Sequence, residues 1–316
     1  MNKDDTVSHS KEELTHNGII SAAAGAVAGL VAGIAVCPLD VVKTRLQIQG
    51  SYHGLGSGLG ANLGVIDTVK SIYQESGFKG FYSGLSPLLI GYLPSWAIYF
   101  YVYKRALQRW EESYVLSAMA AGTCSTIATN PLWMIKTRLM AQNKQTSYHY
   151  KGFTDAVSSV YKGEGIRAFY KGLGPSLIGL PHVAIHFKIY ESLKKQLGSR
   201  FPNGSEPWHI LTASVFSKII ASTLTYPHEV VRSRNQTAIH NEKYKGVFRT
   251  VKTLYLEEGW RVFYAGLGAN ICRAVPSSAV TLVTFELVSN DLNKTWSSSV
   301  VPIPLCDPEL TDDALR

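Results

Sequence analysis

Two basic residues stand inside otherwise uncharged, apolar stretches of this chain. Lys218 interrupts residues 209–226, and Arg273 interrupts residues 267–285. A lone charge in such a segment is costly unless it faces water, a ligand or another charge, and a guanidinium binds two phosphate oxygens at once. We therefore expect both side chains to bind an anionic, phosphorylated solute. The alternative is a structural hydrogen bond to a helix carbonyl.

The sequence offers no arrangement of residues typical of catalysis. His182 and His186 are four residues apart but lack the glutamate and the third ligand of a zinc site. The net charge of +8 suits loops that face an anionic membrane leaflet, and the apolar stretches leave little room for a basic face that would bind nucleic acid. We expect no catalytic residues, no metal, no cofactor and no nucleic-acid partner.

A charged motif follows a proline at three places in the chain. The prolines are 93 and 96 residues apart, so the chain is built from a threefold internal repeat. The three copies of the motif are Pro38-Leu-Asp40-Val-Val-Lys43-Thr-Arg45, Pro131-Leu-Trp133-Met-Ile-Lys136-Thr-Arg138 and Pro227-His-Glu229-Val-Val-Arg232-Ser-Arg234.

Glycines after each motif keep the same register. The first glycine is followed by a second after 13 residues and by a third after 7 more, with a Phe-Tyr pair just before the third. The three sets are Gly64, Gly77 and Gly84; Gly152, Gly165 and Gly172; and Gly246, Gly259 and Gly266. This register makes a chance recurrence of proline and charge a poor explanation.

Each repeat carries two apolar stretches long enough to cross a membrane as helices. Four of them have no charged residue, and the other two contain Lys218 and Arg273. The uncharged ones are 15 to 22 residues long, against the ~20 that a bilayer core requires. They cover residues 18–39, 85–103, 114–135 and 173–187. Between the two stretches of a repeat lies an amphipathic segment such as 65–75 or 153–162, which predicts a short helix on the membrane surface.

The three motifs, the glycine register and the six apolar stretches resemble the mitochondrial carrier family over roughly residues 17–292. The resemblance implies an all-α membrane protein, in which six tilted transmembrane helices form a pseudo-threefold barrel with three short surface helices. It also implies a monomer that spans the mitochondrial inner membrane several times and contacts lipid, cardiolipin above all. The expected parts are a polar tail 1–16, repeats 17–109, 110–200 and 201–292, and a C-terminal tail 293–316.

In this family the charges after each proline form a gate on the matrix side of the cavity. Trp133 stands where the second repeat should carry an acid, so we expect Lys43 to lack a partner. The alternative is that the charges only extend to the membrane interface. The expected ion pairs are Asp40 with Arg232 and Glu229 with Lys136.

Glutamines and a second set of charges complete the gates that the resemblance implies. Gln47 and Gln236 match positions that brace an ion pair by hydrogen bonding, and Met140 replaces the brace in the second repeat. The cytosolic-side pattern is complete only at Glu191 with Lys194. A base replaces the acid in the first repeat, and the third repeat lacks the base, so we expect a weak cytosolic-side gate from Lys104, Glu191, Lys194 and Glu286.

The resemblance also places substrate contacts on the even-numbered spans. Aromatic residues on the second span could stack a flat base, or could simply pack against neighbouring helices. The expected contacts are Trp96, Tyr99 and Tyr103 on the second span, Gly179 and Leu180 on the fourth, and Arg273 on the sixth, with Lys218 on the fifth.

Local sequence narrows the resemblance to one subgroup of the family. Trp133, the segment 221–229 and the segment 181–185 resemble carriers of NAD, pyrimidine nucleotides, FAD and folate, and look most like the NAD carriers of fungi and plants. The implied function is import of NAD⁺ in exchange for AMP or ADP. Alternatives are a pyrimidine nucleotide, FAD or folate carrier, and a carrier-like adaptor or proton-leak protein, which an incomplete cytosolic-side gate would favour.

Overall fold

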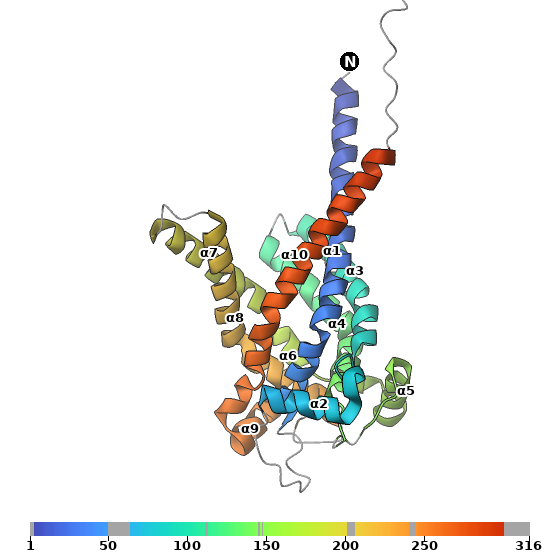
Figure 1. The fold of residues 1–316 in the computed structure, drawn as a ribbon, viewed down its shortest axis with the longest axis vertical. Helices are drawn as coiled ribbons and strands as arrows, with labels where there is room; N and C mark the ends of the chain where they lie inside the picture. Colours follow the sequence, from blue (N-terminus) through green and yellow to red (C-terminus); the bar gives the residue numbers. More distant parts are fainter. Residues whose placement is uncertain are drawn as a thin grey trace, which may run out of the picture. The chain divides into compact units, whose positions relative to one another are not determined.

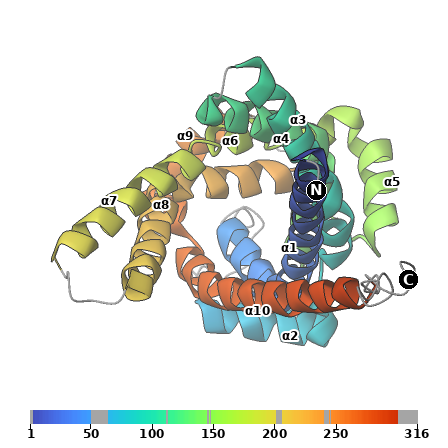
Figure 2. The same cartoon turned by 90° about the horizontal axis from the view of Figure 1, so that it is seen from above.

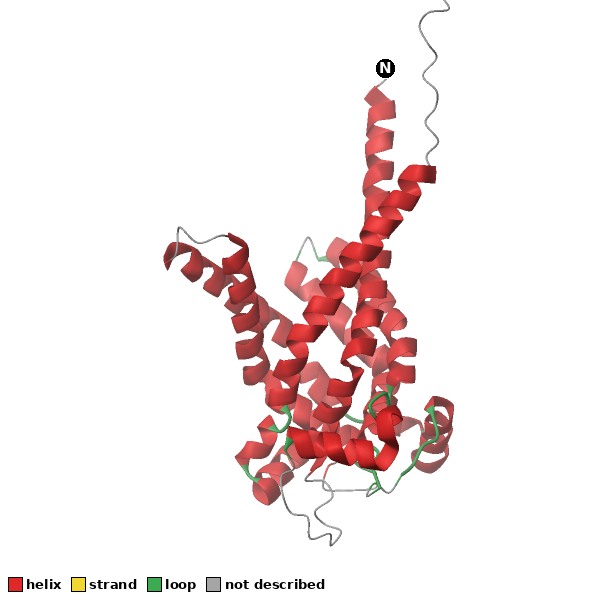
Figure 3. Cartoon of the chain, viewed as in Figure 1, coloured by secondary structure: helices red, strands yellow, loops and turns green. Residues whose placement is uncertain are grey.

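The computed structural model describes residues 3–49, 64–110, 113–144, 146, 148–200, 206–239, 244 and 246–299 of the 316-residue chain. Helices make up nearly all of this part, and no strand occurs in it (Figures 1 and 3). The all-α expectation is therefore confirmed. The chain beyond residue 299 and the glycine-rich segment 50–63 lie outside the described residues.

The long helices follow the apolar stretches. They are α1 (Lys3–Ile48), α3 (Leu85–Arg109), α4 (Tyr114–Ala141), α8 (Glu206–Thr237) and α10 (Leu267–Ser299). Within the described residues, three segments are long and apolar enough to cross a membrane: Ala24–Ile48, Leu85–Arg109 and Trp260–Leu292. Hydropathy thus marks three spans where we expected six.

The even-numbered span of the second repeat is broken in two. It consists of α6 (Leu173–Ile178) and α7 (His182–Arg200), separated by Gly179, Leu180 and Pro181. Proline disfavours the helical conformation of the residue before it, and the glycine ahead of that residue adds freedom. Pro94 and Pro276, in contrast, lie inside the continuous helices α3 and α10.

The first and last long helices reach into the segments expected to be tails. α1 begins at Lys3 and α10 ends at Ser299, although we expected tails over 1–16 and from 293. No proline or glycine occurs in residues 3–16 or 293–299, so nothing in the backbone stops the helices where the apolar pattern ends.

The chain divides into two compact units. One contains residues 1–31 and 279–316, and the other contains residues 32–278. The larger unit holds the three short helices α2 (Val65–Gly80), α5 (Phe153–Glu164) and α9 (Val247–Glu258), which surround the ends of the long helices (Figure 2). In the same unit α3 packs along α4, and α7 packs along α8.

Three buried clusters hold the larger unit together, one for each repeat. In each cluster, apolar residues around the motif proline pack against the short helix that follows in the chain. Ile72 of α2 meets α1, Val160 of α5 meets α4, and Leu254 of α9 meets α8. The amphipathic pattern of the short segments thus has its apolar face on α1, α4 and α8.

The last glycine of each register set connects one repeat to the next. Gly84, Gly172 and Gly266 have φ values of 89°, 79° and 84°, which side chains other than glycine rarely adopt. A Cβ added at these positions would lie 3.1 to 3.2 Å from a backbone carbonyl oxygen of the neighbouring repeat. The carbonyls belong to the first base of each motif: Lys136 beside Gly84, Arg232 beside Gly172, and Lys43 beside Gly266.

Candidate functional site

The charged motifs of α1, α4 and α8 meet around a polar cavity of about 280 Å³ within the larger unit. Four basic and two acidic side chains line it, so its formal net charge is +2 with histidine neutral. The charged lining residues are Asp40, Lys43, Lys136, Glu229, Arg232 and Arg273. The structure therefore brings the expected matrix-side gate residues together, and adds Arg273 to them.

The ion pairs between these helices differ from those expected. Lys43 Nζ lies 2.5 Å from Glu229 Oε2, and Lys136 Nζ lies 3.2 Å from Asp40 Oδ2. The expected pairs of Asp40 with Arg232 and of Glu229 with Lys136 are therefore wrong. Lys43 has a partner, and Arg232 is the base without a carboxylate within ion-pair distance in the described chain.

The error lies in the direction around the ring of helices. Each acid pairs with the base of the following repeat, from α1 to α4 and from α8 to α1. The acid and base of one motif are three residues apart, which turns them by ~300° around the helix axis, so they face different neighbours. That spacing does not say which neighbour is which, because the order of the helices around the ring has to be known first.

α10 contributes two more polar contacts to the same ring. Arg273 Nη1 lies 2.8 Å from Asp40 Oδ1, and Lys43 Nζ donates to Asn270 Oδ1 at 2.9 Å. Asp40 thus accepts from two cations at once. Arg273, expected to bind solute, is held by a carboxylate of the gate, and its side chain remains 34% exposed.

The glutamines do not brace the ion pairs as expected. Gln47 donates to the Tyr226 hydroxyl at 3.1 Å and accepts from Ser233 at 2.6 Å, so it fastens α1 to α8 through neutral groups. Gln236 is fully buried, and its amide has no hydrogen-bond partner among the described residues. Met140, at the equivalent place in α4, accepts a weak contact from the Thr44 hydroxyl at 3.8 Å.

Trp133 takes part in the cavity without replacing the missing acid. Its indole N–H donates to Thr129 Oγ1 at 3.1 Å and lies 3.3 Å from Ser95 Oγ of α3. The ammonium of Lys136 lies 5.3 Å from the centre of its ring, a cation–π contact. Trp133 therefore supports the cation that pairs with Asp40.

A second ring of charges, which the sequence reasoning missed, lies one turn further along α1, α4 and α8. The last base of each motif pairs with a glutamate at the end of the short helix in its own repeat. The pairs are Arg45 with Glu75, Arg138 with Glu164 and Arg234 with Glu258. Each arginine also donates to a carbonyl of the next repeat, at Gln142, Gln236 and Gln47 respectively.

A signal for this ring was present in the sequence. Each of the three glutamates stands one or two residues before the second glycine of its register set. Glu164 is the most enclosed of them, with a side chain 8% exposed between Arg138 and Lys171. Burial by itself raises the pKa of this carboxyl, but hydrogen bonds from Arg138 and Lys171 outweigh it, so the pKa lies below its ordinary value.

The aromatic residues expected to contact substrate stack on one another along α3. Tyr99 and Tyr103 lie parallel with ring centres 6.0 Å apart, and Trp96 stacks on Phe100 at 5.4 Å. None of Trp96, Tyr99 and Tyr103 lines the polar cavity around the gate. In this state they form a ladder on one helix, separate from the charged ring.

The remaining expected substrate residues are also outside the charged ring. Lys218 is exposed on α8 and does not line the cavity. Gly179 lies against the ring of His228, where a Cβ would overlap it, and a Cβ on Gly122 of α4 would lie 3.1 Å from the Leu180 side chain. Arg273 is thus the expected solute contact that the structure places with the gate.

The four residues expected to form the cytosolic-side gate are all exposed to solvent. Lys104, Glu191 and Lys194 are exposed, and within the larger unit no ion pair is formed by any of these three side chains, as far as the chain is described. Glu286 is exposed and belongs to the smaller unit.

Comparison with known proteins identifies the family. The sequence model described as "Mitochondrial carrier protein" matches three times, over residues 15–114, 110–201 and 203–295. The chain belongs to the mitochondrial carrier family. This carrier is therefore a membrane transporter with three repeats, and it is not an enzyme.

Three relatives of this carrier are named for a solute that they transport. It is 41% identical over 289 residues to "Mitochondrial nicotinamide adenine dinucleotide transporter 1" of Saccharomyces cerevisiae, covering 86% of this chain and 77% of the yeast protein. It is 41% identical over 284 residues to "Nicotinamide adenine dinucleotide transporter 2, mitochondrial" of Arabidopsis thaliana, covering 85% and 78%. A second Arabidopsis protein, "Nicotinamide adenine dinucleotide transporter 1, chloroplastic", is 40% identical over 286 residues, covering 86% and 91%.

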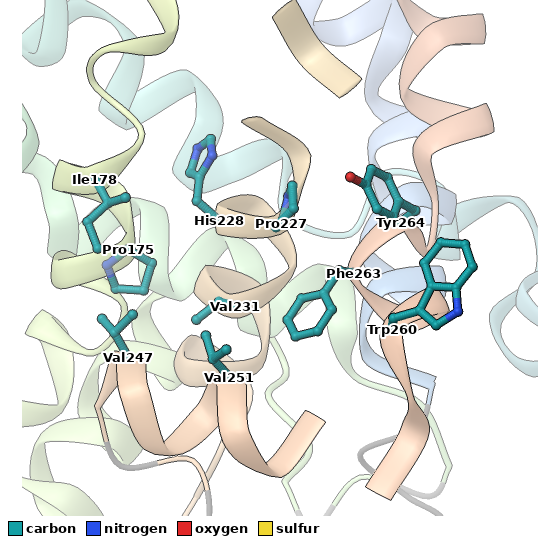
Figure 4. A pocket seen from close by; sticks show the side chains of 10 residues that line it. All are labelled: Pro175, Ile178, Pro227, His228, Val231, Val247, Val251, Trp260, Phe263 and Tyr264. Carbon is teal, nitrogen blue, oxygen red and sulfur yellow. The ribbon is translucent and has the colours of Figure 1, made fainter. Parts of the chain in front are cut away.

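The carrier has a further cavity beside α8, of about 430 Å³ (Figure 4), and His228 lines both this cavity and the polar one. Apolar side chains of α6, α8, α9 and the 3-10 helix η4 (Trp260–Tyr264) line most of it. Pro175 and Ile178 face Val247 and Val251 across it, with Trp260 at one end. Its chemistry suits a hydrocarbon chain, and it contains none of the charged gate residues.

Proposed function

We propose that this carrier imports NAD⁺ in exchange for an adenine nucleotide, AMP or ADP, across the mitochondrial inner membrane. The observation that carries the proposal is the polar cavity with a formal charge of +2 at the meeting point of the motif helices. A cavity of that sign concentrates solutes that carry phosphate. The three relatives are named as transporters of nicotinamide adenine dinucleotide, two of them mitochondrial and one chloroplastic, and for this carrier we propose the mitochondrion.

The proposed architecture is the one that the sequence resemblance implies. Six tilted helices span the membrane, arranged as a barrel with pseudo-threefold symmetry, and α2, α5 and α9 lie at the surface. The repeats cover 17–109, 110–200 and 201–292, with terminal segments 1–16 and 293–316. Because the charged ring is paired while Lys104, Glu191 and Lys194 are unpaired, we assign this state as closed on the matrix side and open to the cytosol.

Alternating access requires the solute to loosen the paired ring. Arg273 is bonded to Asp40 and is still one-third exposed to the cavity, so a solute phosphate can compete with Asp40 for the guanidinium. Losing that bond leaves Asp40 with Lys136 alone, at 3.2 Å. Binding energy would thus be spent on opening the gate formed by Asp40, Lys43, Lys136 and Glu229.

The remaining contacts to the solute lie outside the charged ring. In the proposal Lys218 binds a second phosphate, and Trp96, Tyr99 and Tyr103 stack the bases at successive depths. Gly179 and Leu180 provide a flat apolar surface where α6 ends. Gln47 fastens α1 to α8 beside the gate, and the backbone carbonyl of Gln236 accepts from Arg138 of α4. Glu286 joins Lys104, Glu191 and Lys194 when the carrier closes on the cytosolic side.

Lipid and oligomeric state form part of the same proposal. The apolar cavity of Figure 4 has the size and lining for an acyl chain, and cardiolipin is the lipid we propose there. A single chain is the transport unit in this proposal, and the arginine–carbonyl contacts that fasten each repeat to the next within one chain support it.

Two experiments test the proposal in liposomes that contain the purified carrier. The first measures uptake of labelled NAD⁺ against an excess of unlabelled AMP, UTP, FAD or folate outside. Competition by AMP but not by UTP, FAD or folate is expected, and stronger competition by one of the last three would favour that compound as the solute.

The second experiment replaces Arg273 with alanine. We expect Arg273→Ala to lose most NAD⁺ uptake, because it removes the guanidinium that binds phosphate, while the protein still folds. Arg167→Ala is the matched control, since Arg167 is exposed in the 3-10 helix η2 (Ile166–Tyr170) and does not line the cavity. Undiminished uptake by Arg273→Ala would contradict the assigned site.

A further inference from the structure

The charged ring has a gap at one of its three positions. Two acids each pair with the base of the following repeat, Asp40 with Lys136 and Glu229 with Lys43. By the same rule the residue at the acid position of α4 should pair with Arg232 of α8. That residue is Trp133, so Arg232 faces the cavity without a carboxylate in ion-pair reach within the described part of the chain.

Trp133 cannot neutralise Arg232. Its indole N–H is a donor, as is a guanidinium, and is already used by Thr129 Oγ1 and Ser95 Oγ. Its ring is in cation–π contact with the ammonium of Lys136. Trp133 therefore leaves the positive charge of Arg232 without the counter-charge that this position holds in the other two repeats.

The remaining carboxylates of the cavity do not fill the gap either. Asp40 accepts from Lys136 and Arg273, and Glu229 is held by Lys43 at 2.5 Å. The two acids leave two of the four cavity cations in excess. A guanidinium withdrawn from bulk water without a partner is strongly unfavourable, so a site of this kind favours a bound anion.

We propose that Arg232 binds a phosphate group of the transported solute, and that this phosphate takes the place of the third carboxylate of the ring. The inference rests on the proposed function in so far as the solute is a nucleotide. The guanidinium offers two parallel N–H donors to a phosphate, as it would to an aspartate. The ring is then complete only when solute is present, which makes Arg232 and Arg273 two separate phosphate contacts in one cavity.

The first test replaces Trp133 with aspartate or asparagine and measures thermal unfolding of the purified full-length carrier with increasing AMP or inorganic pyrophosphate. The two variants have nearly the same shape and differ by one charge, so asparagine controls for the loss of the indole. We expect Trp133→Asp to pair with Arg232, to unfold at a higher temperature without ligand than Trp133→Asn, and to need on the order of tenfold more AMP for half of the maximal shift. Equal AMP dependence of the two variants would overturn the inference.

The second test covers the case in which the aspartate variant does not fold. Arg232→Gln removes the charge but keeps a shorter polar side chain, and Lys252→Gln removes one charge elsewhere, at an exposed position of α9. We expect a tenfold or larger rise in the half-saturating concentration of pyrophosphate for Arg232→Gln and none for Lys252→Gln. The same concentration for both variants would refute a phosphate contact at Arg232.

These tests separate the inference from the proposed solute. If wild-type carrier exchanges NAD⁺ but pyrophosphate protects Arg232→Gln as well as wild type, the inference is wrong and the proposed function stands. If pyrophosphate protection depends on Arg232 while liposomes take up no NAD⁺, the phosphate site stands and the assigned solute is wrong.

Discussion

Of the two acids that line the polar cavity, Asp40 is the one that pairs with two cations, and replacing it with asparagine gives a quantitative prediction. Its two carboxylate oxygens accept from Lys136 at 3.2 Å and from Arg273 at 2.8 Å, and its side chain is 12% exposed. A hydrogen bond to a charged group contributes ~1.5–3 kcal/mol when buried. Because the Arg273 side chain is one-third exposed, we count its bond at less than half. The expected loss for Asp40→Asn is therefore about 2–4 kcal/mol.

The assay is thermal unfolding of the purified carrier in detergent without ligand. For a chain of this size ~1 kcal/mol corresponds to a shift of ~2–4 °C, so Asp40→Asn should unfold about 5–15 °C below wild type. Asp67→Asn is the control with the same chemical change, since Asp67 is exposed in the first turn of α2 and contributes at most ~1 kcal/mol through the helix dipole.

Two results would refute the reasoning about Asp40. An Asp40→Asn variant that unfolds within a degree or two of wild type would mean that the Asp40 carboxylate does not form two stabilising ion pairs in the unliganded state. A drop of equal size in Asp67→Asn would mean that the assay reports loss of any carboxylate rather than loss of the gate.

Two further predictions concern the outer ring and the glycine contacts. Since the pKa of Glu164 is lowered from about 4.5, its pairs with Arg138 and Lys171 stabilise the fold above that pH and lose this effect as the pH falls through the lowered pKa. Glu164→Gln should therefore lower the unfolding temperature most at pH 7 and make it less dependent on acid, as scans from pH 7 to about pH 2.5 would show, since the effect is lost below the ordinary pKa of a glutamate; parallel curves for variant and wild type would contradict this. Gly172→Ala should destabilise by ~1–2 kcal/mol, because φ is +79° and the new Cβ would lie 3.2 Å from a carbonyl of the next repeat, whereas Gly163→Ala, in open space on α5, should be neutral or stabilising in the same thermal scans. Equal unfolding temperatures for the two alanine variants would remove the argument for a strict glycine.

The repeated features of the fold could be predicted from the sequence because they are local. A proline with charges after it, an amphipathic segment and a glycine in register each depend on neighbours in the chain. Val160 and Leu254, which belong to two of the buried clusters, lie in short helices whose apolar periodicity is visible in residues 153–164 and 247–258. The seven glycines with positive φ in the described chain all belong to this register.

The partners in the ion-pair ring could not be predicted, because they depend on the order of helices around an axis. Both possible directions leave two pairs and one orphan base, so the number of pairs was right while Lys43 and Arg232 were exchanged as the orphan. The sequence shows that the second motif lacks an acid, because Trp133 stands at that position. It does not show which base lies opposite Trp133. That identity decides where a phosphate contact is proposed.

Contacts between repeats were the other feature beyond the reach of local patterns. Arg273 was expected to bind the solute and not a gate residue. Its hydrogen bond to Asp40 joins residues 233 positions apart in the chain. Gln47 was expected beside an ion pair and instead joins Tyr226 and Ser233 of α8. Each of these side chains has several polar groups within reach, so only the packed structure selects among them.

The most direct measurement of the central claim is uptake of labelled NAD⁺ into liposomes that contain the purified carrier and are either loaded with AMP or empty. The account predicts rapid uptake into the AMP-loaded liposomes, matched by loss of internal AMP, and little uptake into empty ones. Equal NAD⁺ uptake with and without internal nucleotide would contradict obligatory exchange. No NAD⁺ uptake under either condition, by protein that still unfolds cooperatively, would contradict the assignment of the solute.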